Sequence, residues 1–250
     1  MPDNKLLSRN PAILSQSVWI FLLLLMFWMS AFISWQILSK ADFFYSFWYQ
    51  AISIDEHIDR YAVQNYNKDG FELTSDAERA RLFGDIVRAI NSDGEGLSAI
   101  VYKKGMAEEA LLTNAEIIHL KDVAHLIGVF KFSGLVAFLL FTLLLVVVLK
   151  LNLGRPFLFR ILAWFMLGLM LMVGAVILIG PRKIFYRLHT LVFPDNHQWF
   201  FYYQESLMST MMKAPDLFAC IGINWLFFSL LITLFFYGLT VRAFSLKDSF

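Results

Sequence analysis

The sequence predicts an all-α integral membrane protein that has four transmembrane helices and an α-helical extracytoplasmic loop domain between spans 1 and 2. Two observations support this fold class. Hydrophobic residues make up 58% of the chain and charged residues only 16%, whereas soluble domains are about 45–50% apolar and about one quarter charged. The apolar residues also gather in four runs, each close to the roughly 20 residues that a helix needs to cross a bilayer.

The positions of the four runs define the domain organisation. The predicted spans cover residues 17–38, 132–149, 161–180 and 219–241. The segments around them are a cytoplasmic N-terminus at 1–16, an extracytoplasmic loop domain at 39–131, a cytoplasmic loop at 150–160, an extracytoplasmic loop at 181–218 and a cytoplasmic C-terminus at 242–250. The first run follows Lys5 and Arg9, as a signal peptide would, but it is longer than a usual signal-peptide core and no small-residue cleavage site follows it. We therefore predict a membrane anchor.

The orientation follows from the lysine and arginine residues of the short segments, which are enriched on the cytoplasmic side of membrane proteins. With the N-terminus inside, the short cytoplasmic segments carry seven of these residues and the short outer segment carries four. This distribution predicts a multi-pass protein with both termini in the cytoplasm. The loop domain at 39–131 and the loop at 181–218 would then both be extracytoplasmic.

An interfacial helix is predicted at 114–130, directly before the second span. Thr113 and Glu116 have the spacing of a capping box, in which the hydroxyl and the carboxylate each accept from the other residue's backbone amide. The apolar residues of this helix share one face, whereas its charged residues and histidines gather on the other. Such an amphipathic helix can lie in the membrane interface. We therefore expect the chain to bend near 132–134 before the second span descends into the bilayer.

Histidines are the main candidates for chemistry. All five fall in the two loops predicted to be extracytoplasmic, and they are His57, His119, His125, His189 and His197. A histidine can act as a general acid or base near neutral pH. His119, Asp122 and His125 have a spacing that suggests a metal site, but on a helix the two imidazoles would point about 120° apart, so we expect no metal ion. The alternative is that Asp122 orients the imidazole of His119, since the two are adjacent on the helix.

A second candidate segment begins at Pro181, because proline favours the first turn of a helix. On such a helix Tyr186 and His189 fall on one face together with Phe193. A histidine among aromatic residues near the membrane surface is unlike a solvated loop histidine. Arg187 belongs to the same segment, and its charge could bind an anionic substrate group or a lipid headgroup.

Other function classes find little support. A net charge of +1 is not the basic balance expected of a nucleic-acid-binding protein. The single cysteine, Cys220, excludes a disulfide or a set of cysteine ligands within this chain. The sequence also lacks the Gly-x-Ser-x-Gly, P-loop, His-Glu-x-x-His and dinucleotide-binding motifs. We expect no cofactor.

Three strings of residues resemble those of the bacterial lipoprotein intramolecular transacylase family. The first is a group of aromatic residues directly after the first span. The second string precedes the second span, and the third follows the third span. They contain Tyr45 and Tyr49, then Thr113, Glu116, His119 and Asp122, and finally His189, Phe193, Trp199, Pro215 and Phe218. The similarity in the arrangement of spans extends over nearly the whole chain.

The resemblance implies an enzyme at the outer leaflet of the bacterial cytoplasmic (inner) membrane. It would move the sn-2 acyl chain of a diacylglyceryl-modified lipoprotein onto the amine of the lipoprotein's own N-terminal cysteine, giving the lyso form. His119 is then expected to be the general base, oriented by Asp122, and His189 the general acid or oxyanion donor, although the two roles can be exchanged. The residues expected to bind substrate are Tyr45, Tyr49, Glu116, Tyr186, Arg187 and Trp199.

The partners that the resemblance implies are diacylglyceryl lipoproteins and membrane lipid, with no nucleic acid. The residues by themselves leave one alternative open, namely a non-catalytic membrane protein whose outward loops bind a lipid or a protein partner. Replacing His119 and His189 singly with alanine separates the two interpretations, because only the enzyme would lose an acyl-transfer activity.

Overall fold

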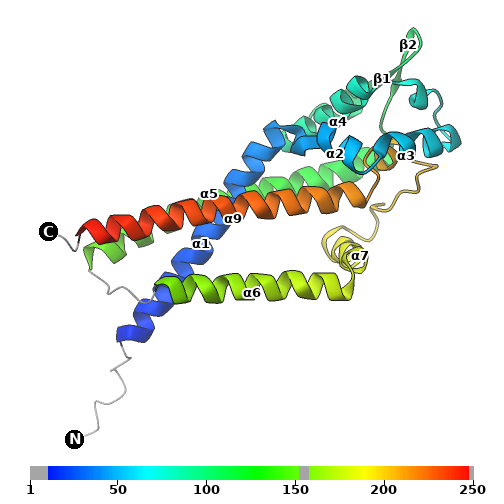
Figure 1. The fold of residues 1–250 in the computed structure, drawn as a ribbon. Helices are drawn as coiled ribbons and strands as arrows, with labels where there is room; N and C mark the ends of the chain where they lie inside the picture. The colour runs from blue at the N-terminus through cyan, green and yellow to red at the C-terminus, as the bar shows by residue number, and fades with distance from the viewer. Residues whose placement is uncertain (1–10, 152–157, 248–250) are drawn as a thin grey trace, which may run out of the picture. The chain divides into compact units, whose positions relative to one another are not determined.

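The computed structural model describes residues 11–151 and 158–247, which are mostly helical (Figure 1). Four of the helices are long and apolar enough to cross a membrane. They are α1 (Pro11–Lys40), α5 (Asn114–Lys150), α6 (Leu158–Ile179) and α9 (Asp216–Lys247). The predicted fold class, an all-α membrane protein with four transmembrane helices, is therefore confirmed. Each predicted cytoplasmic segment lies partly outside the described residues, and the side of the membrane on which each loop lies stays a prediction.

The chain forms two compact units. The first, called the span unit, comprises Met1–Ser34, Phe132–Ile179 and Leu226–Phe250, as far as these are described. The second, called the loop unit, comprises Trp35–Lys131 and Gly180–Trp225. The loop unit contains all five histidines. Any chemistry that depends on histidine therefore belongs to the loop unit.

The span unit is held together by apolar and aromatic side chains from its four helices. Trp19 of α1 packs edge-on against Phe244 of α9, with ring centroids 5.0 Å apart. Phe27 of α1 packs in the same way against Phe165 of α6 at 5.4 Å. Most apolar side chains of α6 are nevertheless exposed, as suits a helix whose surroundings are lipid tails as apolar as its own residues.

Helix α5 joins two segments that the sequence analysis separates. Its start is as expected, because the Thr113 amide donates to a Glu116 carboxylate oxygen at 2.6 Å and the Glu116 amide donates to the threonine hydroxyl at 3.3 Å. The helix then continues without interruption to its end, so the predicted interfacial helix and the second span are one helix, and the bend near 132–134 stays a prediction. The glycine in that stretch allows a close contact with α1. A β-carbon at Gly134 would lie only 2.6 Å from the Phe32 side chain of α1.

The loop unit combines short helices with one hairpin. Its elements between α1 and α5 are η1 (Asp42–Phe44), α2 (Tyr45–Ala51), α3 (Ile54–Tyr61), η2 (Ala62–Gln64), η3 (Phe71–Leu73), α4 (Asp76–Asn91), η4 (Leu97–Ala99), β1 (Val101–Lys104) and β2 (Ala107–Ala110). Between α6 and α9 lie α7 (Pro181–Val192) and α8 (Leu207–Met211). The antiparallel β1–β2 hairpin (Figure 1) departs from the expected all-helical loop domain. Its strands lack the alternating apolar face that would have indicated them, since only Tyr102 is buried.

A buried arginine fixes α4 against α2. The Arg79 guanidinium of α4 donates to the Tyr49 hydroxyl of α2 at 2.6 Å. It also donates to the Thr74 hydroxyl at 3.1 Å and to the Glu72 carbonyl at 2.8 Å. The Tyr49 hydroxyl donates in turn to the Asp76 carboxylate at 2.8 Å. These bonds satisfy a charge that is costly to bury alone, and they hold α4 in place as one wall of the pocket described next.

Candidate active site

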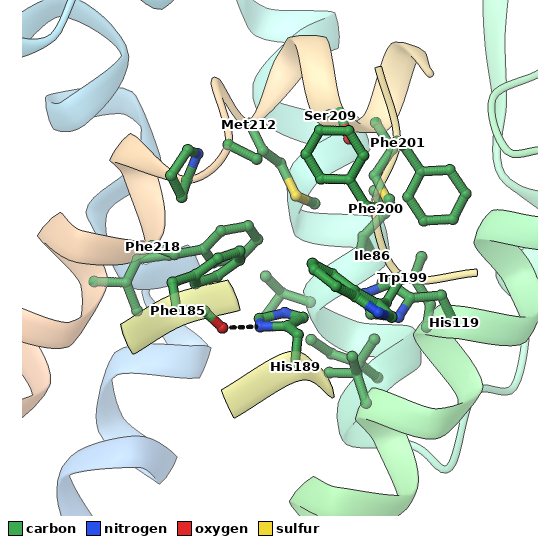
Figure 2. A pocket seen from close by; sticks show the side chains of 18 of the residues that line it. Ile86, His119, Phe185, His189, Trp199, Phe200, Phe201, Ser209, Met212 and Phe218 are labelled. Atoms are coloured by element: carbon green, nitrogen blue, oxygen red, sulfur yellow. Dashed lines mark hydrogen bonds between the residues drawn. The ribbon is translucent and has the colours of Figure 1, made fainter. Parts of the chain in front are cut away.

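A pocket of about 330 Å³ lies within the loop unit. Its walls come chiefly from α4, α5, α7, the segment that follows α7, and the connection between α8 and α9 (Figure 2). The lining is mainly aromatic and aliphatic and includes Ile86, Phe185, Trp199, Phe200, Phe201, Met212 and Phe218. Among the described residues, no aspartate, glutamate, lysine or arginine lines it. A charged group in this pocket would lose its hydration without gaining an ionic partner.

Two histidines from distant parts of the chain meet in the pocket. His119 comes from α5 and His189 from α7, and their ring centroids are 6.3 Å apart. Phe193 lies against both, at 4.7 Å from His119 and 5.1 Å from His189. None of the other three histidines lines the pocket. The structure therefore brings together the two histidines expected to act as a pair.

The hydrogen bond made by His189 determines which ring nitrogen is available. Its Nδ1 lies 2.8 Å from the Phe185 carbonyl oxygen, as the dashed line in Figure 2 marks. Because a carbonyl only accepts, Nδ1 carries the proton, and in the neutral ring Nε2 keeps its lone pair. Burial lowers the pKa of His189 below its ordinary value, and the bond to Phe185 opposes this effect. The ring is therefore neutral near pH 7 and can accept a proton at Nε2.

His119 has an unsatisfied nitrogen. Its side chain is only 9% exposed, and its Nδ1 has no hydrogen-bond partner among the described residues. A buried polar group without a partner costs about 1–3 kcal/mol. A bound substrate that hydrogen-bonds this nitrogen would recover that cost. His119 is thus placed to contact a polar group of a ligand in an otherwise apolar pocket.

Asp122 does not orient His119, which corrects one prediction. Its carboxylate instead binds Nδ1 of His197 at 2.6 Å. The two α5 residues are about 60° apart around the helix axis because they are separated by three positions. His119 therefore turns into the pocket, while Asp122 turns toward the segment that follows α7. That segment continues into residues 199–201, which line the pocket, so the Asp122–His197 pair ties part of the lining to α5.

Two of the expected substrate-binding residues lie in the pocket and one does not. Tyr186 and Trp199 both line it. The Trp199 ring centroid is 5.1 Å from that of His189 and 5.9 Å from that of Tyr186. The indole N–H of Trp199 has no partner among the described residues, so it can donate a hydrogen bond to a ligand. Arg187 is exposed and does not line the pocket.

The other three expected substrate-binding residues are buried outside the pocket lining. The Tyr45 hydroxyl donates to the Met211 carbonyl at 2.9 Å, and Tyr49 belongs to the Arg79 cluster of hydrogen bonds. Glu116 caps α5 and also accepts a hydrogen bond from the Ser206 hydroxyl. These three side chains hold elements of the loop unit together, and none of them lines the pocket.

Several parts of the lining are missing from the residues proposed on sequence grounds. They include the α4 wall with Ile86, and Ser209 of α8 with Met212 after it. The helix-like pattern around residues 77–91 indicates an apolar face on α4, but a pattern does not reveal what that face covers. The described residues hold no group of three or more His, Cys, Asp or Glu side chains arranged to bind a metal ion.

Four helices able to span a membrane, together with a buried histidine pair, define an integral membrane protein with a candidate acid–base site. A family model described as lipoprotein intramolecular transacylase Lit matches residues 17–215. The chain therefore belongs to the lipoprotein intramolecular transacylase family, and it is an enzyme of a bacterial membrane. This confirms the resemblance found in the sequence and sets aside the non-catalytic alternative.

Three solved structures of the membrane integral lipoprotein intramolecular transacylase Lit from Bacillus cereus share this fold. One is 15% identical and has a TM-score of 0.66, covering 95% of this chain and 99% of that chain. A variant with a histidine replaced by arginine is 16% identical, with a TM-score of 0.64 and coverages of 95% and 94%. A variant with a histidine replaced by alanine is 15% identical, with a TM-score of 0.65 and coverages of 95% and 97%. No curated protein matches the chain significantly.

Proposed function

We propose that this enzyme moves the sn-2 acyl chain of a diacylglyceryl-modified lipoprotein onto the α-amine of the lipoprotein's own N-terminal cysteine. His119 and His189 act as the acid–base pair. The observation that carries the proposal is the meeting of these two imidazoles, 6.3 Å apart, in an apolar pocket. The family to which the chain belongs makes a lipoprotein the natural substrate.

The reaction requires two proton transfers. The lone pair of the amine attacks the ester carbonyl, and the amine proton passes to an imidazole nitrogen. The tetrahedral intermediate then collapses, the bond to the glyceryl oxygen breaks, and that oxygen leaves with the proton of the imidazolium that formed in the first step. The products are an amide and a free hydroxyl on the same molecule. Because amine and ester belong to one substrate, correct positioning alone can supply a large part of the rate.

The hydrogen bonds favour one assignment of roles. His189 is the general base, since its Nδ1 proton is fixed by the Phe185 carbonyl and its Nε2 is left to accept a proton. Burial lowers the pKa of His119 to about 4, so its ring stays neutral and donates a hydrogen bond to the ester oxygen, which would satisfy the buried nitrogen that has no partner among the described residues. The Trp199 indole can donate to the oxyanion. This assignment exchanges the roles first expected for the two histidines.

The proposed site acts at the outer leaflet of the bacterial cytoplasmic membrane. The excess of lysine and arginine in the segments on the N-terminal side of the bilayer supports this placement, since seven stand there against four in the short outer loop. The two termini would then be cytoplasmic and the loop unit extracytoplasmic. Cysteine labelling with a membrane-impermeant reagent at exposed positions of the loop unit tests this topology.

The decisive experiment compares lipoprotein N-termini from cells that express each variant. The product is an isomer of the substrate, so intact mass does not report the reaction. Tandem mass spectrometry distinguishes an amide-linked acyl chain from two ester-linked chains. In His189→Asn, the amide nitrogen can take the place of Nδ1 and donate to Phe185, but no atom replaces Nε2. We expect a rate loss of about 10²–10⁴-fold with an unchanged melting temperature.

A matched control is His125→Asn, because His125 is an exposed histidine of α5 that does not line the pocket. It should keep full activity. His119→Asn should lose activity as His189→Asn does. If either pocket variant transfers acyl chains at the wild-type rate, the histidine-pair mechanism is wrong. If the wild-type protein produces no amide-linked chain, the proposed reaction itself is wrong.

A further inference from the structure

A second cavity lies in the span unit, between α1 and α6, with a volume of about 830 Å³. Its walls are apolar side chains of the two helices, such as Leu24, Phe27 and Phe165. The exceptions among the lining residues are Gln16 and Arg160, which both stand near the beginning of their helices, together with the indole of Trp164. The cavity is therefore a hydrophobic groove that carries a positive charge.

Arg160 is exposed and stands at the rim of the groove. Among the described residues, its guanidinium makes no ion pair or hydrogen bond. The described residues of the span unit also contain no aspartate or glutamate. No described residue of the span unit can therefore act as its counter-ion, and a basic residue at the membrane surface attracts anionic lipid headgroups. Arginine presents a planar fork of donors that matches a phosphate group.

Two further residues indicate that the occupant of the groove is a lipid. Trp164 lines the groove one turn after Arg160 and is 66% exposed, and tryptophan favours the headgroup region of a bilayer. Gly168 also lines the groove, and a β-carbon added there would meet nothing within 4 Å. Helix packing therefore does not require this glycine, and its missing side chain leaves the groove open.

We propose that the groove between α1 and α6 binds a glycerophospholipid. The lipid phosphate pairs with Arg160, and an acyl chain lies along the apolar walls toward Gly168. A second copy of this chain fits less well, because the described part of the span unit offers no carboxylate for Arg160. The site is separate from the histidine pocket, and it does not depend on the reaction proposed above.

Native mass spectrometry of the purified full-length protein in mild detergent, with added phosphatidylglycerol, tests the site. Wild-type protein should retain one tightly held lipid. Arg160→Gln should weaken binding by about tenfold or more, since hydrogen bonds to charged groups are the stronger class. The matched control is Arg242→Gln, which neutralises an exposed arginine of α9 that does not line the groove. It should bind as wild type does.

A second pair of variants tests the shape of the groove. Gly168→Leu fills it and should reduce lipid retention, whereas Gly174→Leu, at an equally open glycine of α6 outside the groove, should not. Diacylglycerol, which lacks the phosphate, should not be retained by any variant. Equal retention of phosphatidylglycerol by all four variants would overturn the proposal and indicate non-specific surrounding lipid. A dimer that Gly168→Leu abolishes, with lipid retention unchanged, would also overturn it in favour of a second copy.

Discussion

Replacing Ser206 with alanine should lower the free energy of unfolding by about 3 kcal/mol. Ser206 is 1% exposed, and its hydroxyl takes part in two hydrogen bonds at once. Its hydroxyl donates to the Glu116 carboxylate and accepts from the Ser209 amide at 2.8 Å. It therefore connects the first turn of α5, which leads to His119, with the first turn of α8, which carries Ser209 of the pocket.

The magnitude comes from two separate losses. An alanine at the N-cap of a helix costs about 1 kcal/mol, because one backbone amide loses its acceptor. The same change leaves a carboxylate oxygen of Glu116, whose side chain is 0% exposed, without its serine donor. A buried polar group left unpaired in this way costs about 1–3 kcal/mol. The serine hydroxyl itself is small, so the loss of packing adds little.

The measurement is reversible unfolding in detergent micelles, followed by circular dichroism. The control is Thr190→Ala, which removes an exposed hydroxyl whose only bond is to a carbonyl of its own helix, and which should change stability by less than about 0.5 kcal/mol. Glu116→Gln combined with Ser206→Ala in a double-mutant cycle should show coupling of at least about 0.5 kcal/mol. A loss below about 1 kcal/mol for Ser206→Ala would refute the reasoning.

Three further changes test other parts of the structure. Burial lowers the pKa of His189 below 6.5, so the neutral base persists as the pH falls. The rate for bound substrate should therefore decline only below pH 6.5, and a decline centred above that value contradicts the mechanism. Asp122→Asn should weaken the bond to His197 and speed hydrogen–deuterium exchange in the residues after α7, with α4 unaffected. Unchanged exchange would show that this bond does not hold the segment to α5. Gly134→Ala should cost about 1–3 kcal/mol because an α1 ring fills the space, whereas Gly128→Ala, which meets nothing within 4 Å, should be tolerated in the same unfolding assay.

The features that sequence reasoning predicts well are those set by local composition or spacing. Hydropathy locates the four long helices, because crossing a bilayer requires a continuous apolar run. The spacing of Thr113 and Glu116 places the start of α5, since a capping box involves only neighbouring residues. The approach of His119 and His189 followed from the family resemblance, because two residues 70 positions apart in the sequence carry no local signal of contact.

The errors concern polar side chains whose partners lie far along the chain. Asp122 pairs with a histidine 75 residues away, although the nearer His119 has suitable helical spacing. Tyr45 and Tyr49 are buried in hydrogen bonds to distant elements, whereas their place in a family motif suggested substrate contacts. The contact of Gly134 with α1 is likewise invisible in the local sequence. In each case the tertiary partner determines the role, and the local pattern contains no information about it.

The uncharged lining of the histidine pocket has a consequence for which amines can react. An ammonium group has no counter-ion there, so under the proposed function only the deprotonated amine is admitted. A terminal α-amine has a pKa of about 7.7–8.0 and a lysine side chain one of about 10.4, so the free-base fraction of the α-amine near neutral pH is a few hundred times larger. The pocket would therefore select the N-terminus of its substrate over nearby lysines through basicity alone, without any residue that recognises the difference.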